Sequence, residues 1–154
     1  MTRETGENSF AVREALEDLM WEKVGVVRNG PDLEKAVAGL QELQSRAAAC
    51  GGAAKDGGTT YNSRWNEAIN VVNLASTAEL IARSALTREE SRGAHYRQDF
   101  PEQDPRWLKN IRVKSGSNGS AEFSTSPVQF TRLAPPASMT TPAAPTSEPA
   151  GAKS

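Results

Sequence analysis

The sequence is poor in the residues that build disulfides and metal centres. Among its 154 residues there are one cysteine, Cys50, and one histidine, His95. A single cysteine excludes an internal disulfide and is typical of a reducing compartment. The spacing between Cys50 and His95 matches no zinc site. No serine, cysteine or second histidine completes a nucleophilic catalytic site around His95. We therefore expect no metal-binding residue and no nucleophilic catalytic centre.

The sequence also lacks a long hydrophobic run and an excess of charge of one sign. No apolar stretch approaches the ~20 residues of a membrane span, and no signal-peptide pattern opens the chain. With 18 Lys and Arg against 19 Asp and Glu, nothing favours nucleic acid or an acidic membrane surface as a partner. We expect a cytoplasmic protein with no nucleic-acid partner and no direct membrane insertion.

Bulky apolar residues are scarce at the two ends of the chain. Residues 134–154 hold five of the nine prolines and almost no large apolar side chain, so they cannot bury enough surface to offset the entropy of ordering. Residues 1–9 have a similarly polar composition. The sequence therefore predicts a disordered N-terminus over 1–9, a folded region over 10–133 and a disordered Pro/Ala/Thr-rich tail over 134–154.

Within the folded region, apolar residues recur at helical spacing in three segments. The first begins at a cap on Ser9, ends at Asn29-Gly30 and carries Val12, Leu16, Leu19, Met20, Val24 and Val27. The second starts with Pro31 in its first turn, closes at Gly51-Gly52 and carries Leu33, Val37, Leu40 and Leu43.

The third segment is the longest, with a cap on Asn62 or Ser63 and an end near Glu90. It carries two overlapping apolar stripes, which is typical of a helix between two neighbours. One stripe holds Trp65, Ile69, Val72 and Ala75, and the other holds Val71, Leu74, Ala78, Ile81 and Ala85. The fold class predicted is all-α, a three-helix up-down-up bundle.

Two segments after the bundle alternate apolar and polar residues around a Gly- and Ser-rich turn. They are Trp107–Lys114 and Ala121–Phe130, and the pattern indicates a β-hairpin or extended ribbon. Because two strands alone are marginal in water, we expect the ribbon to lie on the bundle or on another domain. The glycine-rich stretches here and at residues 51–58 match no phosphate-binding fingerprint, so no cofactor-binding residue is expected.

The segment from Ser84 to Leu108 gathers His95 with several charged residues. A catalytic interpretation makes His95 a general base and an arginine a clamp for an anionic substrate. A structural interpretation has Arg92 and His95 hold the loop through carbonyls and carboxylates, with Asp99 as one candidate partner of Arg92. Between Arg88 and Arg112 six cations face five anions, which suits a salt-bridged interface. We favour a structural or docking role, with Trp21, Trp65 and Trp107 as core or interface anchors.

The same segment resembles a known family. Residues 90–101, ESRGAHYRQDFP, followed by an acidic stretch and Trp107-Leu108, are similar to the C-terminal domain of the flavoprotein subunits of succinate dehydrogenase and fumarate reductase, which have L-aspartate oxidase among their relatives. The segments 19–30 and 66–86 resemble helices of that domain. The resemblance covers residues 10–132 and implies a spectrin-repeat-like three-helix bundle.

The resemblance also sets expectations about function. The family's enzymes bind FAD in an N-terminal domain, and their catalytic groups lie there and in a capping domain. This sequence contains neither, so the resemblance implies no catalytic, cofactor-binding or metal residue here. It implies a docking or structural motif, formed by Arg92, His95, Arg97, Asp99 and Trp107.

We expect a docking or structural module of a split or truncated FAD-dependent oxidoreductase that is inactive alone. Its partner would be the flavin-binding domain or another subunit, and through partner subunits it would lie peripheral to a membrane. The alternatives are a free-standing helical interaction module and, less favoured, a hydrolase built on His95.

Overall fold

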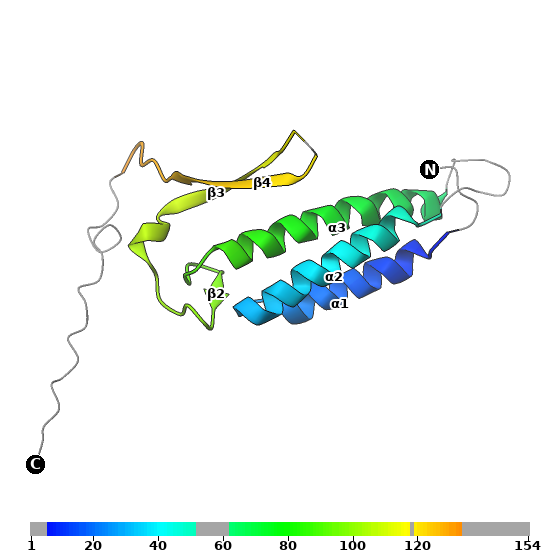
Figure 1. The fold of residues 1–154 in the computed structure, drawn as a ribbon, viewed down its shortest axis with the longest axis horizontal. Helices are drawn as coiled ribbons and strands as arrows, with labels where there is room; N and C mark the ends of the chain where they lie inside the picture. The colour runs from blue at the N-terminus through cyan, green and yellow to red at the C-terminus, as the bar shows by residue number, and fades with distance from the viewer. Residues whose placement is uncertain (1–5, 52–61, 118, 134–154) are drawn as a thin grey trace, which may run out of the picture.

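The computed structural model describes residues 6–51, 62–117 and 119–133, and these form three helices and two small sheets (Figure 1). The tail predicted over 134–154 and residues 1–5 lie outside the described residues. In the rest of the N-terminal segment, the Glu7 N–H donates to the Ala49 carbonyl at 3.2 Å. The Glu7 carboxylate pairs with Arg46 at 2.6 Å. Residues 6–8 therefore contact the end of the second helix.

The three helices alternate in direction along one bundle axis, as Figure 1 shows. They are α1 (Ser9–Val24), α2 (Gly30–Ala48) and α3 (Ser63–Thr87). The cap of α1 is Asn8 and not Ser9, because the Asn8 side chain accepts the Phe10 N–H at 3.1 Å. Asn29 caps α2 and Asn62 caps α3 through the same kind of bond. None of the described helices is long and apolar enough to cross a membrane.

The bundle core combines large side chains from two helices with small ones from the third. Leu33 and Leu40 of α2 and Val12 of α1 are fully buried. α3 presents a stripe of small residues to them: Ala68, Val71, Ala75, Ala78, Ala82 and Ala85. Short side chains at this spacing let the helix backbones approach closely, so the leucines of α2 fill the space that remains.

The prediction of two buried stripes on α3 was wrong for its larger residues. Ile69 is 37% exposed, Leu74 38% and Ile81 48%. The buried face is the alanine-rich one, because α1 and α2 both pack there. α3 also ends at Thr87, short of Glu90, since Arg88 adopts an extended backbone with φ −84° and ψ 112°.

A parallel two-stranded sheet joins the loop after α1 to the segment after α3. β1 (Val27–Arg28) pairs with β2 (Tyr96–Arg97), and the Gln98 N–H donates to the Arg28 carbonyl at 2.8 Å. This sheet explains why α1 ends at Val24 and not at Asn29. Val27, expected on the buried stripe of the first helix, is 55% exposed in the strand. The all-α prediction did not include this sheet.

The predicted hairpin is present with shorter strands. β3 (Lys109–Ser115) pairs antiparallel with β4 (Ala121–Pro127), and a short 3-10 turn, η1 (Pro105–Trp107), precedes it. Gly119 in the turn has φ +79°, a conformation that favours glycine. The hairpin runs beside α3 (Figure 1), where the Arg83 guanidinium lies 4.4 Å from the centre of the Phe123 ring. The ribbon therefore lies on the bundle.

Candidate functional site

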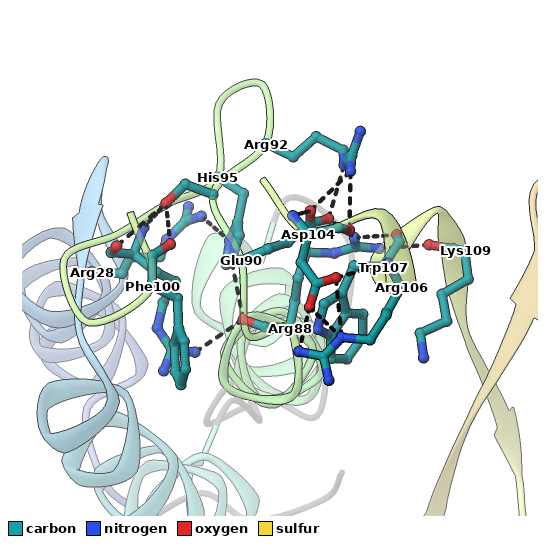
Figure 2. A network of polar contacts seen from close by, with 12 residues as sticks. Arg28, Arg88, Glu90, Arg92, His95, Phe100, Asp104, Arg106, Trp107 and Lys109 are labelled. Carbon is teal, nitrogen blue, oxygen red and sulfur yellow. Dashed lines mark hydrogen bonds and ion pairs between the residues drawn. The ribbon is translucent and has the colours of Figure 1, made fainter. Parts of the chain in front are cut away.

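The charged segment, residues 88–108, folds over the end of α3 and carries all five predicted motif residues. Figure 2 labels three of them, Arg92, His95 and Trp107. A tight turn begins it, in which the Arg92 N–H donates to the His95 carbonyl at 2.8 Å and the His95 N–H donates back at 3.0 Å. Gly93 inside this turn has φ +59°, where a side chain would be strained. The turn directs the chain back toward β1.

Arg97 is the centre of the buried contacts in this segment. It is 2% exposed, and its Nη1 donates to the carbonyls of Ala85, Leu86 and Arg88 at 3.0–3.1 Å. The last carbonyls of a helix have no partner inside the helix. Arg97 satisfies three carbonyls at the end of α3 and so acts as its C-terminal cap from a distant strand.

Asp99 connects the same arginine to α2. Arg97 donates to both Asp99 oxygens at 2.7 Å in a two-pronged contact. Asp99 Oδ2 also accepts the Gly30 N–H, at the start of α2, at 2.9 Å. The hydrogen bond from Arg97 is the main reason that the pKa of Asp99 falls to about 2. The carboxylate therefore links β2 and α2 as an anion.

Glu90 is a buried centre of this network whose contacts the sequence did not predict. Its side chain is fully buried and accepts from Arg92 Nε at 2.8 Å, from Arg88 Nη1 at 2.5 Å and from the Asp104 N–H at 3.0 Å. Burial raises the pKa of Glu90, but the hydrogen bonds from Arg92, Asp104 and Arg88 outweigh it, and the pKa is lowered. The available signal was its place between arginines two residues away on either side.

The expected partner of Arg92 needs a correction. Arg92 does bind a carboxylate, but through Nε and Nη2 to Glu90 and not to Asp99. Its Nη2 also reaches the Asp104 carbonyl at 3.4 Å. Asp99 is already occupied by Arg97, so the two arginines of the motif use different carboxylates.

His95 contacts a residue that no sequence pattern linked to it. Arg28 Nη1 lies 2.9 Å from His95 Nδ1, and His95 Nε2 lies 3.4 Å from the Arg88 carbonyl. Because a guanidinium only donates, Nδ1 accepts and the proton sits on Nε2. Burial, and then the nearby arginines, lower the pKa of His95, while its bond to the Arg88 carbonyl opposes them. Both ring nitrogens are engaged, so neither is free to take a proton from a substrate here.

The three tryptophans have different environments. Trp107 is half-buried, with Lys109 Nζ 4.5 Å and the Arg88 guanidinium 5.3 Å from its ring centre. Trp65 is half-buried near the start of α3. Trp21 is 84% exposed, so it is not a core residue, and only the interface interpretation remains open for it.

The buried polar side chains of the described residues are all used within the chain. No buried side-chain nitrogen or oxygen among them lacks a hydrogen-bond partner. Within the same residues, no three His, Cys, Asp or Glu side chains gather. The buried Cys50 has a pKa raised by burial. The arrangement is suited to holding backbone segments together.

The family comparisons agree with the resemblance. The model described as "Fumarate reductase flavoprotein C-term" matches residues 13–143. The chain is 39% identical over 111 residues to one subunit of the fumarate reductase (CoM/CoB) of Methanothermobacter marburgensis, covering 72% of this chain and 20% of the relative. It is 34% identical over 131 residues to a fumarate reductase flavoprotein subunit of Mycobacterium tuberculosis, covering 84% and 22%.

A solved structure has the same fold. A chain of a quinol-fumarate reductase with menaquinol molecules superposes with a TM-score of 0.74 and 30% identity, over 84% of this chain and 22% of that one. The protein thus spans about a fifth of the length of the curated relatives it matches. From the matched family model and these identities, the chain belongs to the family of fumarate reductase flavoprotein C-terminal domains.

Proposed function

We propose that this chain is a docking or structural module of a FAD-dependent succinate/fumarate oxidoreductase. It packs against a flavin-binding domain or another subunit, which holds the FAD and supplies the catalytic groups. Through that assembly it lies peripheral to a membrane. The motif residues Arg92, His95, Arg97, Asp99 and Trp107 order the segment at the end of α3, and no catalytic, cofactor-binding or metal role is assigned to them.

The observation that carries this proposal is the internal pairing of the charged segment. Arg97 and Glu90 are buried, and their donors and acceptors are used by carbonyls, carboxylates and N–H groups of the same chain. A group that reacts with a substrate needs an atom that can reach it. Side chains that are hydrogen-bonded within the chain stabilise the conformation of the segment. A docking module needs such a defined surface for its partner.

The test is co-expression with a fumarate reductase flavoprotein subunit from which the matching C-terminal segment has been removed. We expect the two chains to co-purify with the visible absorbance of bound flavin, while this chain purified alone shows none. Failure to associate, in co-expression and after mixing of purified chains, would favour a free-standing interaction module. Bound flavin with succinate–acceptor activity in this chain alone would contradict the assignment of no catalytic role.

A further inference from the structure

Arg28 differs from the other arginines around the charged segment because it has no carboxylate partner in the described part of the chain. Arg88 and Arg92 share Glu90, and Arg97 pairs with Asp99. Arg28 instead donates from Nε to the Val24 carbonyl at 3.0 Å and from Nη1 to His95. Its positive charge is therefore not neutralised by the described residues.

A hollow of about 440 Å³ opens on one side of Arg28, between α3 and β3. Its apolar wall is formed by Leu80, Ile81 and Ile111, and its cationic end by Arg28 and Arg88. No carboxylate of the described residues lines it. Ile81 is 48% exposed, so the hollow presents apolar surface directly to solvent beside the unneutralised guanidinium.

A second hollow of about 530 Å³ opens on the other side of Arg28, along the end of α1 and β1. It is lined mainly by apolar side chains, among them Trp21, Val26 and Val27, which are 84%, 75% and 55% exposed. An arginine and a tryptophan set among aliphatic side chains is the composition enriched at the centres of protein interfaces.

We propose that Arg28 and its two flanking hollows form a docking surface that receives a carboxylate side chain of a partner polypeptide, with apolar side chains on both sides of it. This inference rests on the docking role proposed above and adds the chemistry of the partner. A guanidinium presents paired donors that match a carboxylate. His95 is neutral and Glu90 already neutralises part of the Arg88 and Arg92 charge, so Arg28 supplies the free cation.

The shape of the surface favours a polypeptide over a small molecule. Small-molecule sites enclose most of the surface of their ligand. Both hollows here are open along one side, and Arg28 lies between them as part of both linings. A single occupant that fills both hollows must be extended and must carry its charge between two apolar groups, as a Leu-Asp-Leu sequence does.

The experiment is an NMR titration of the full ¹⁵N-labelled and methyl-labelled chain with two matched probes, acetyl-Leu-Asp-Leu-amide and acetyl-Leu-Asn-Leu-amide. We expect the Asp peptide to shift the Arg28 Nε–H signal and the Ile81 and Ile111 methyl signals, and to bind at least about tenfold more tightly than the Asn peptide. Arg28→Gln should remove that preference. Arg112→Gln, which deletes an exposed charge on the hairpin, is the matched control and should leave it intact.

A second variant tests the same surface if Arg28→Gln fails to fold. Ile81→Glu places a carboxylate on an exposed helix position in the first hollow, and we expect it to repel the Asp peptide while the chain keeps its thermal unfolding midpoint. Equal binding of the two peptides, or an unchanged preference in Arg28→Gln, would overturn the proposal. Acetate or inorganic phosphate binding as tightly as the Asp peptide would replace it with a site for small anions.

The co-expression assay separates this inference from the proposed function. If the chain co-purifies with the truncated flavoprotein and Arg28→Gln does so equally well, the docking role stands and the role of Arg28 is refuted. If no association occurs in any condition, the proposed function fails, and the peptide titration still decides whether Arg28 selects a carboxylate.

Discussion

The bundle core and the charged segment at its end are held together by different forces. The core consists of fully buried apolar residues such as Leu33, Leu40 and Val12, and burial of apolar surface has no preferred direction. The charged segment contains Arg97, 2% exposed, and Glu90, with no exposed surface. Each is kept there by hydrogen bonds of defined geometry from several parts of the chain.

This difference shows how a helix end can be completed from outside the helix. The core fixes the positions of α1, α2 and α3, but it leaves the last carbonyls of α3 without partners. Arg97 supplies those partners, and its counterion Asp99 accepts the first N–H of α2. Because buried charges are costly unless they are paired, arrangements of the segment that leave Arg97 or Glu90 without a partner are disfavoured.

The largest effect on stability is expected from a substitution in the bundle core. Leu40→Ala should lower the free energy of unfolding by about 3 kcal/mol, because it removes fully buried methyl groups and leaves a cavity against the small residues of α3. Urea unfolding followed by circular dichroism measures it. The loss should be the same at low and high salt, and a strong salt dependence would contradict an apolar core.

The next effect tests the charged segment. Arg97→Ala should cost about 2–3 kcal/mol, because two carbonyls of the last turn of α3 and that of its C-cap lose a donor and Asp99 loses its counterion. The same unfolding measurement applies, with Arg97→Lys as the control. Lysine keeps the charge but not the planar fork, so it should recover only part of the loss. Full recovery by lysine would mean that charge alone matters here.

A smaller loss is expected at the rim of the network. Arg92→Ala should cost about 1 kcal/mol, more than the roughly 0.5 kcal/mol of a typical surface change. The effect is limited because Glu90 keeps Arg88 and the Asp104 N–H as partners. Unfolding midpoints of the variant and of Arg112→Gln should therefore differ. Equal midpoints would place Arg92 among ordinary surface residues.

The smallest effect concerns pH. The pKa of His95 is lowered in the folded chain, so the unfolded chain takes up the proton more readily. His95 therefore contributes stability at pH values above its ordinary pKa of about 6.5, and the contribution falls as the pH drops below that value. We expect a small loss of stability as the pH falls from about 7 to about 5.

His95→Asn keeps an acceptor for Arg28 but cannot titrate in this range, so the pH dependence should disappear from its unfolding midpoints. A second loss of folding stability at lower pH comes from Asp99 and Glu90, whose pKa values are also lowered. Their contribution is present above their ordinary values and is lost below about pH 4, which separates it from that of His95. If the unfolding midpoint of His95→Asn still changed between pH 7 and pH 5 as that of the unsubstituted chain does, the change would come from another titrating group.

Much of the fold could be predicted because its signals are local. The leucines of the second segment recur at helical spacing, and Asn62, one of the two residues predicted to cap the third, does cap it. The hairpin follows from alternation around a glycine turn. The predicted helix ends were wrong where a neighbouring residue or strand pairing took precedence. Asn8 caps α1 in place of Ser9, and Val27, predicted to lie in the first helix, pairs in a strand. Larger residues of α3 such as Ile81 stay exposed because the alanine face fits the neighbouring helices.

The candidate site could be predicted in its members but less well in its contacts. Arg92, His95, Arg97, Asp99 and Trp107 do lie in the segment that contacts the end of α3, and Figure 2 shows Arg92, His95 and Trp107 there. Arg92 bonds a carboxylate and a carbonyl as predicted, but the carboxylate is that of Glu90 and not of the suggested Asp99. Glu90 was missed as a centre of the network. Alternating charges offer several pairings of similar local geometry, so the order of residues does not select one.

By itself, the sequence determined three helices, a hairpin and membership of a family, because periodicity and motif are properties of neighbouring residues. Only the tertiary structure decided which polar groups meet across the chain. Arg28 and His95 are 67 residues apart, and Gly30 and Asp99 are 69 apart. Such pairs form when the apolar core has placed β1 beside β2, and the cost of leaving a buried polar group without a hydrogen bond then favours each partner.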